Sequence, residues 1–215
     1  MAEFALDSCV ETAGHMNGGA RLCIARHGET DWNAAGILQG WSDVPLNAAG
    51  RAQAQRLAAD FSACGFVAVW SSPLLRALET ASIIADRLGL PPPRCHDGLK
   101  ERHFGIIQGV PKIELAELNP LLLQQILKRN PAAEFVDGES MDEFADRVLA
   151  ALGEIAAQPG PLLVITHGWV LDVVTRQLRG LPRDALLGHK PGNGECLWLD
   201  AVAVAEKESA IITDS

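Results

Sequence analysis

At residues 22–28 the chain reads Leu-Cys-Ile-Ala-Arg-His-Gly, and at residues 162–168 it reads Leu-Leu-Val-Ile-Thr-His-Gly. Each stretch is a short apolar run that ends in a reactive side chain, which is typical of a buried strand in a parallel sheet. Ligands of such sheets bind beyond the carboxyl ends of the strands. If the two strands are neighbours, His27 and His167 meet in one crevice.

Strand and helix patterns alternate between these two runs. The pattern predicts a helix capped by Asn47, a strand at residues 67–70, and a helix opened by Ser72 and Pro73 and ended by Gly89. This alternation predicts an α/β fold: a three-layer, doubly wound and mostly parallel sheet with helices on both faces.

The periodicity weakens at residues 97–137, where two short helical stretches are separated by Asn119-Pro120. We interpret this segment as a small helical cap insertion. Ser140 and Glu143 form a capping box that opens a long helix. The remaining elements are expected to be a helix at 169–178 and one or two closing strands at 195–204.

Length and composition favour a single domain. The 215 residues, 48% of them hydrophobic, suffice for one well-buried core, which we assign to residues 20–215. Residues 1–19 are expected to be a flexible extension, since they are rich in small and polar residues and carry no export signal. The five cysteines show no Cys-x-x-Cys spacing, so the sequence predicts neither a zinc site nor a disulfide framework, which favours a cytoplasmic location.

Charge and hydropathy narrow the range of partners. A formal net charge of -9 argues against nucleic acid, whose binding depends on Lys and Arg. The apolar runs fall far short of the ~20 residues that cross a bilayer, so no membrane partner is expected. The sequence leaves the oligomeric state open, a homodimer included.

The residues around the first His-Gly pair suit phosphate chemistry. Phosphoryl transfer needs a nucleophile, cations that hold the phosphate oxygens, and an acid that protonates the leaving oxygen. Arg26 precedes His27, Asn33 follows six residues later, and Arg76 lies in the first turn of the helix after Ser72. Nearby guanidinium groups disfavour a protonated imidazole, so His27 is expected to be neutral. A cationic His167 would stabilise charge on the transferred group.

The order and spacing of a larger set of residues resembles the histidine phosphatase superfamily, in its phosphoglycerate mutase-like branch and compact phosphatase type. The resemblance covers nearly all of residues 21–200. It rests on Arg26-His27-Gly28-Glu29-Thr30, Trp32-Asn33, Gln39-Gly40-Trp41, Pro45-Leu46, Gly50, Ser72-Pro73, Arg76-Ala77, Thr80-Ala81, Leu99-Lys100-Glu101, Phe104-Gly105, Gly109 and His167-Gly168.

The resemblance implies a role for each matching position. It implies that His27 is phosphorylated while Arg26, Arg76 and His167 surround the phosphate and Asn33 adds a side-chain donor. Glu101 matches the family's proton donor; without the motif it reads as a solvated loop carboxylate partnered by Lys100 or Arg102. The expected substrate- and phosphate-binding residues are Asn33, Gln39, Gly40, Arg102, Lys112 and Gly168, of which Arg102 and Lys112 match mutase positions that contact the substrate carboxylate.

The expected activity is a phosphomonoesterase that hydrolyses a small phosphorylated metabolite through a phosphohistidine. The stretch from Glu101 to His167 is short for the long lid of a mutase, and exposure to water favours hydrolysis. Two alternatives stay open: a 2,3-bisphosphoglycerate-dependent phosphoglycerate mutase, and a non-catalytic module that binds phospho-ligands. No metal-ligand spacing, P-loop or dinucleotide fingerprint is present, so neither a metal nor another cofactor is predicted.

Overall fold

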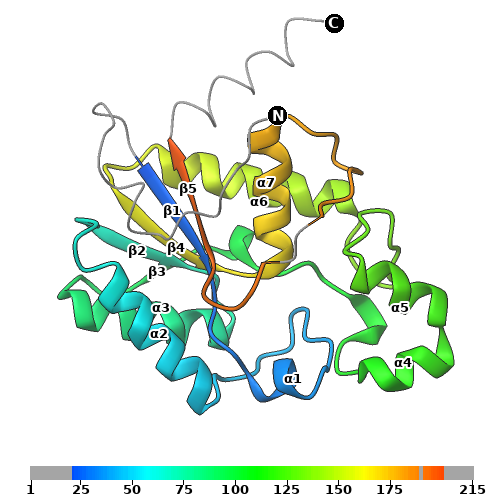
Figure 1. The fold of residues 1–215 in the computed structure, drawn as a ribbon. Helices are drawn as coiled ribbons and strands as arrows, with labels where there is room; N and C mark the ends of the chain where they lie inside the picture. The colour runs from blue at the N-terminus through cyan, green and yellow to red at the C-terminus, as the bar shows by residue number, and fades with distance from the viewer. Residues whose placement is uncertain (1–20, 189–190, 201–215) are drawn as a thin grey trace, which may run out of the picture.

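The computed structural model describes residues 21–188 and 191–200 (Figure 1). The predicted extension at residues 1–19 and the predicted strand beyond residue 200 lie outside the described residues. The strands are β1 (Arg21–Arg26), β2 (Ala68–Ser71), β3 (Arg94–Cys95), β4 (Leu162–Thr166) and β5 (Cys196–Asp200). The α-helices are α1 (Asp31–Ala34), α2 (Ala48–Asp60), α3 (Leu75–Leu88), α4 (Lys112–Leu118), α5 (Pro120–Leu127), α6 (Met141–Ala156) and α7 (Gly168–Arg179).

The described strands form a five-stranded sheet in the order β3-β2-β4-β1-β5. The first four are parallel, and β5 runs antiparallel beside β1. The central strands β1 and β4 pair with Arg26 opposite Thr166. Both His-Gly pairs therefore leave the sheet side by side at the same edge, which confirms the predicted α/β architecture.

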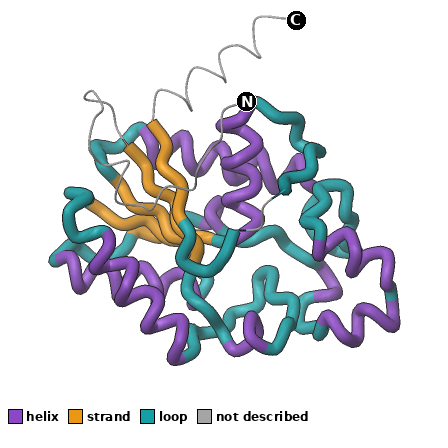
Figure 2. Tube along the Cα trace, in the orientation of Figure 1, coloured by secondary structure: helices purple, strands orange, loops and turns teal. Residues whose placement is uncertain are grey.

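Helices cover both faces of the sheet (Figures 1 and 2). Side chains of β1 alternate between the faces: Leu22 and Ile24 belong to one apolar cluster with residues of α6 and α7, whereas Cys23 and Ala25 belong to another with residues of α2 and α3. Strands buried on both faces account for the continuous apolar runs in the sequence.

The N-termini of the helices show which of the predicted capping residues are correct. Asn47 caps α2 by accepting from the Gly50 N–H, and the capping box that opens α6 is present. The predicted cap at Ser72 is wrong: α3 begins after Leu74, which makes no side-chain cap. The Ser72 hydroxyl accepts from the Leu74 N–H, just before the helix, at 3.3 Å, and it also lies 2.8 Å from Nε2 of His167, so it takes part in a tertiary contact that the local pattern does not indicate.

The predicted cap insertion contains α4 and α5, together with 3₁₀ turns at Asp97–Leu99 and Gly105–Ile107. Figure 1 shows α4 and α5 set apart from the sheet, on the side to which the carboxyl ends of the central strands lead. No helix in the described ranges is long and apolar enough to span a bilayer.

Candidate active site

His27 is the first residue after β1 and is 3% exposed. Its Nδ1 lies 2.6 Å from the Gly28 carbonyl oxygen. Because a carbonyl only accepts, Nδ1 carries the proton and Nε2 keeps its lone pair. Nε2 accepts a hydrogen bond of 3.3 Å from Nε of Arg76. The ring is thereby oriented with its basic nitrogen toward the arginine.

The turn after His27 is fixed by close packing. A Cβ on Gly28 would lie 2.5 Å from the Gly50 carbonyl oxygen, which leaves room only for glycine. The Gly28 N–H donates to Oγ1 of Thr80 at 3.0 Å, and that hydroxyl donates to the Arg76 carbonyl. The start of α2 and the first turns of α3 therefore hold the histidine in place.

Arg76 lies in the first turn of α3 and is 1% exposed. Its Nη1 and Nη2 donate to the carbonyls of Ser42 and Gly40 at 2.9 and 2.7 Å. Gly40 has φ +52°, a conformation that favours glycine. Burial lowers the pKa of Arg76 to about 10, which still leaves it charged at neutral pH.

His167 is fully buried, and its ring centroid lies 5.1 Å from that of His27. Burial, followed by the charges of Arg76 and Arg26, lowers the pKa of His27 well below its usual value. The same causes lower the pKa of His167, with His27 adding to them. Both imidazoles are therefore neutral in this state, so His167 does not carry the cationic charge that we considered.

Arg26 completes the cationic side of the crevice. Its Nη1 donates to the Pro191 carbonyl at 2.7 Å, whereas its buried Nε has no hydrogen-bond partner. Burial and the charge of Arg129 lower the pKa of Arg26 to about 10. An unpaired buried N–H is costly, which makes this group available to an incoming oxyanion.

Glu101 faces the same cavity as His27 and Arg76. One carboxylate oxygen accepts from the Arg102 N–H at 3.0 Å. The alternative, a solvated carboxylate held by Lys100 or Arg102, does not fit this geometry: Glu101 is 8% exposed, Lys100 pairs with Asp97, and the Arg102 guanidinium binds carbonyls elsewhere.

The cavity brings together most of the residues expected from the sequence, but not all. It is lined by Arg26, His27, Asn33, Ile37, Leu38, Gln39, Gly40, Arg76, Glu101, Phe104, Lys112, Ile126, Leu127, Arg129 and Trp169. His167 lies behind this lining, against His27. Gly168 is the first residue of α7 and is not among the lining residues either.

Arg102, expected at the substrate, is used within the fold. Its guanidinium donates to the carbonyls of Glu139, Pro131 and Ala133 at 3.1, 3.4 and 2.8 Å. It is 1% exposed and does not line the cavity. A side chain with these contacts secures the segment before α6 and does not reach toward a ligand.

Arg129 is a cavity residue that the sequence pattern did not reveal. It forms an ion pair with Asp172 of α7, and its buried Nη2 has no partner. Asn193, in the segment before β5, was also missed: its amide donates to the His27 carbonyl at 2.9 Å. Neither residue stands in a local motif, so only the fold identifies them.

In chemical terms the cavity is suited to binding an oxyanion, with an imidazole and a carboxylate beside it. Three guanidiniums and Lys112 surround a neutral imidazole, and Glu101 is the carboxylate among the lining residues. Within the described residues, no group of three or more His, Cys, Asp or Glu could hold a metal ion. Cations around an imidazole with a free lone pair are chemically suited to binding a phosphate beside a nucleophile.

Comparison with known proteins identifies the family. Residues 22–203 match the model of the histidine phosphatase superfamily, branch 1, and the chain belongs to this superfamily. It is 38% identical to phosphoglycerate mutase-like protein 4 of Arabidopsis thaliana over 74% of this chain and 71% of the relative. It is 33% identical to the uncharacterized phosphatase PhoE of Bacillus subtilis over 74% and 77%.

A similar solved structure agrees with this family assignment. The mycobacterial glucosyl-3-phosphoglycerate phosphatase, in a complex with VO3, superimposes with a TM-score of 0.76 at 28% identity, covering 85% of this chain and 93% of that one.

Proposed function

We propose that the protein is a phosphomonoesterase that hydrolyses a small phosphorylated metabolite through a phosphohistidine at Nε2 of His27. The observation that carries the proposal is the hydrogen bond from Nδ1 of His27 to the Gly28 carbonyl. It leaves the other nitrogen basic, and Arg76 lies within 3.3 Å of that nitrogen to hold the phosphate.

In the first step the lone pair of Nε2 attacks phosphorus while the bond to the leaving oxygen breaks. Arg26 and Arg76 would bind the non-bridging oxygens, and their charge would offset the charge of the transferring group. Asn33 would present its NH2 group, because its oxygen already accepts from Thr30. His167 would donate a hydrogen bond from Nδ1 to a phosphate oxygen, since this nitrogen is buried and has no hydrogen-bond partner in the protein.

Glu101 would move the protons. In the first step its carboxyl protonates the departing alkoxide; in the second, the resulting carboxylate takes a proton from the water that attacks phosphohistidine. Its position on the same cavity as Nε2 of His27 supports both roles. Gln39 and Gly40 would lie beside the bound ester, since they line the cavity next to Arg76.

The cap side of the cavity suggests a substrate with a second acidic group. Lys112 and Arg129 line this part, and burial together with the charges of Arg26 and Arg129 lowers the pKa of Lys112. Phosphoglycerate stands in the names of the Arabidopsis relative and of the mycobacterial phosphatase described above, and its carboxylate would suit these cations. We propose a phosphorylated carboxylic acid as the preferred substrate class.

The same two cations also favour the second candidate, a phosphoglycerate mutase that depends on 2,3-bisphosphoglycerate. A mutase must keep water from the phosphohistidine while the intermediate turns round. The short stretch between Glu101 and His167 favours the hydrolase.

The test is the fate of the phosphoryl group. The protein is incubated with 3-phosphoglycerate and a trace of 2,3-bisphosphoglycerate, and free phosphate and 2-phosphoglycerate are both measured. A phosphatase releases phosphate at least about tenfold faster than it isomerises, whereas a mutase isomerises with little release. A third result, the same slow release by wild type and His27→Ala across a screen of phosphomonoesters, would favour a non-catalytic binding module.

A further inference from the structure

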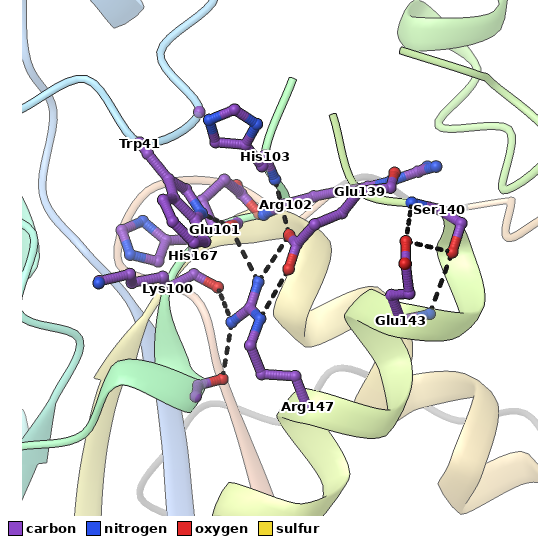
Figure 3. Close-up of polar contacts among 12 residues, drawn as sticks. Trp41, Lys100, Glu101, Arg102, His103, Glu139, Ser140, Glu143, Arg147 and His167 are labelled. Atoms are coloured by element: carbon purple, nitrogen blue, oxygen red, sulfur yellow. Dashed lines mark hydrogen bonds and ion pairs between the residues drawn. The ribbon is translucent and has the colours of Figure 1, made fainter. Parts of the chain in front are cut away.

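Arg147 of α6 does not line the cavity, yet it binds the backbone of the segment that carries Glu101 (Figure 3). Its Nη1 donates to the carbonyls of Gly98 and Lys100 at 3.0 and 3.1 Å. Its Nη2 donates to the carbonyl of Glu101 at 3.3 Å. The guanidinium of Arg147 therefore fixes the backbone from Gly98 to Glu101, the segment that leads to the Glu101 carboxylate.

Glu139 holds Arg147 in this position. Its two carboxylate oxygens accept from Nε and Nη2 of Arg147 at 2.8 and 2.7 Å, a bidentate pair. Together with the three carbonyls, this pair uses all five N–H groups of the guanidinium. Glu139 also accepts from the His103 N–H at 2.8 Å, on the other side of Glu101. The pair is therefore connected to the chain both before and after the carboxylate.

Trp41 connects the same segment to the phosphate-binding arginine. Its indole Nε1 donates to the Glu101 carbonyl at 2.7 Å. Its ring lies below the Lys100 ammonium, 4.8 Å from Nζ, and 5.7 Å from the guanidinium carbon of Arg147. Its neighbours Gly40 and Ser42 accept from Arg76. The loop around Trp41 thus bridges the group that would hold the phosphate and the group that would protonate the leaving oxygen.

We propose that Arg147, held by Glu139, is a positioning residue that aims the Glu101 carboxyl at the leaving-group oxygen. The inference rests on the proposed function. The proton passes from Glu101 to the leaving oxygen as the phosphorus–oxygen bond breaks and the bond to Nε2 of His27 forms. Proton transfer needs the donor within hydrogen-bond reach, and a misplacement of about 1 Å can cost about 100-fold.

The experiment compares two esters in the Arg147→Gln variant: p-nitrophenyl phosphate, whose leaving group departs without a proton, and benzyl phosphate, whose alkoxide needs one. The quantity measured is kcat/KM, which reports the step that expels the leaving group. We expect kcat/KM for benzyl phosphate to fall about 10- to 100-fold and that for p-nitrophenyl phosphate to fall less than about threefold.

Three further variants separate positioning from general damage. Arg147→Lys, which cannot donate five hydrogen bonds, should restore part of the benzyl phosphate activity. Trp41→Phe keeps the ring and removes only Nε1, so it should show the same selectivity for benzyl phosphate with a smaller loss, about threefold. The matched control Arg183→Gln removes an exposed arginine paired with Asp142 and Asp146 of α6, and should change neither ester.

The decisive arm repeats Arg147→Gln in a Glu101→Gln background. If Arg147 acts through Glu101, the second substitution lowers kcat/KM for benzyl phosphate by less than about twofold more. The proposal would be overturned if Arg147→Gln lowered kcat/KM equally for both esters. It would also be overturned if Arg147→Gln lowered kcat/KM for benzyl phosphate as much in the Glu101→Gln background as it does in the wild type. If Arg147→Gln does not fold, Trp41→Phe in both backgrounds decides by the same criteria. Failure of the proposed function is visible separately, because wild type would then release phosphate from neither ester.

Discussion

The floor and the cap of the cavity are built in different ways. On the floor, Arg26 ends one central strand and His27 follows it, His167 follows the end of the neighbouring strand, and Arg76 lies in the first turn of a helix on one face of the sheet. On the cap side, Lys112 begins α4 and Arg129 follows α5, outside the sheet. The floor is thus fixed by strand pairing within the sheet, whereas the cap is held outside the sheet by loop hydrogen bonds, such as that from the Lys112 N–H to the Gly36 carbonyl, and by side-chain contacts such as the Arg129–Asp172 pair.

We expect this structural difference to divide the residues that carry out the reaction from the residues that select the substrate. A group fixed by parallel strand pairing keeps the geometry that phosphoryl transfer demands. Cap residues can change between related proteins without altering the sheet, since loops and insertions tolerate change better than the core. In the proposed function the floor would therefore carry out the chemistry, and the cap would determine which phosphorylated acid is accepted.

The largest expected effect is on the floor, in Arg76→Met. Loss of a buried donor that contacts Nε2 of His27 should lower kcat/KM for every phosphomonoester by about 10³-fold, because the transferring group loses a preorganised charge. Steady-state assays on several esters check this. Arg87→Met, at an exposed position on the same helix, is the control and should keep wild-type kinetics. If kcat/KM fell for only one class of ester, Arg76 would act in substrate selection, and the proposed division of roles between floor and cap would be wrong.

Arg102→Met should affect stability. The substitution leaves the carbonyls of Glu139, Pro131 and Ala133 without their buried donor, and we expect the free energy of unfolding to fall by about 2 to 3 kcal/mol. Urea unfolding followed by fluorescence measures it. If Arg102 instead binds substrate, the variant will unfold like wild type and lose affinity for carboxylate-bearing esters.

On the cap, Arg129→Met should lower kcat/KM for phosphorylated acids about tenfold and leave that for p-nitrophenyl phosphate within about threefold. The reason is that Arg129 lines the cavity from the cap, just after α5, and in the proposed function would bind the carboxylate of the substrate. The adjacent exposed Lys128 provides a matched control, Lys128→Met, for loss of one positive charge. Equal losses for both ester classes would place Arg129 in the phosphate site.

The smallest expected effect is a dependence of stability on pH. Burial lowers the pKa of His27 and of His167 in the folded protein, so below the unfolded value of about 6.5 the unfolded chain binds more protons. Stability therefore falls as the pH falls, by about 1 kcal/mol per histidine between about pH 7.5 and about pH 5.5. Urea unfolding at both pH values tests this; in His27→Gln the pH-dependent loss should be smaller by that amount, and an unchanged loss would contradict it.

The floor could be predicted from the sequence because its signals are local. A strand followed by His-Gly is recognisable twice, and parallel pairing brings the two ends together. The capping box at Ser140 and the terminal Gly89 are local as well, and both are observed. Ser72 shows where local patterns fail, since its hydroxyl contacts His167, 95 residues away in the chain.

The cap could not be predicted in the same detail. Arg129 pairs with Asp172, which is 43 residues further along the chain. Arg102 donates to carbonyls that are about 30 residues further along. No spacing in the sequence distinguishes such arginines from solvent-exposed ones. The resemblance to mutases placed Arg102 at the substrate, but its burial behind the cavity lining left that role without geometric support, and Arg129 lines the cavity instead.

The most direct test is to trap the covalent intermediate. The protein is mixed with a ³²P-labelled substrate and quenched in base, and the labelled peptide is sequenced by mass spectrometry. The account predicts an alkali-stable, acid-labile label on His27 that forms within one turnover and is absent from His27→Ala. Label on any other residue, or phosphate release with no labelled protein at any time, would contradict it.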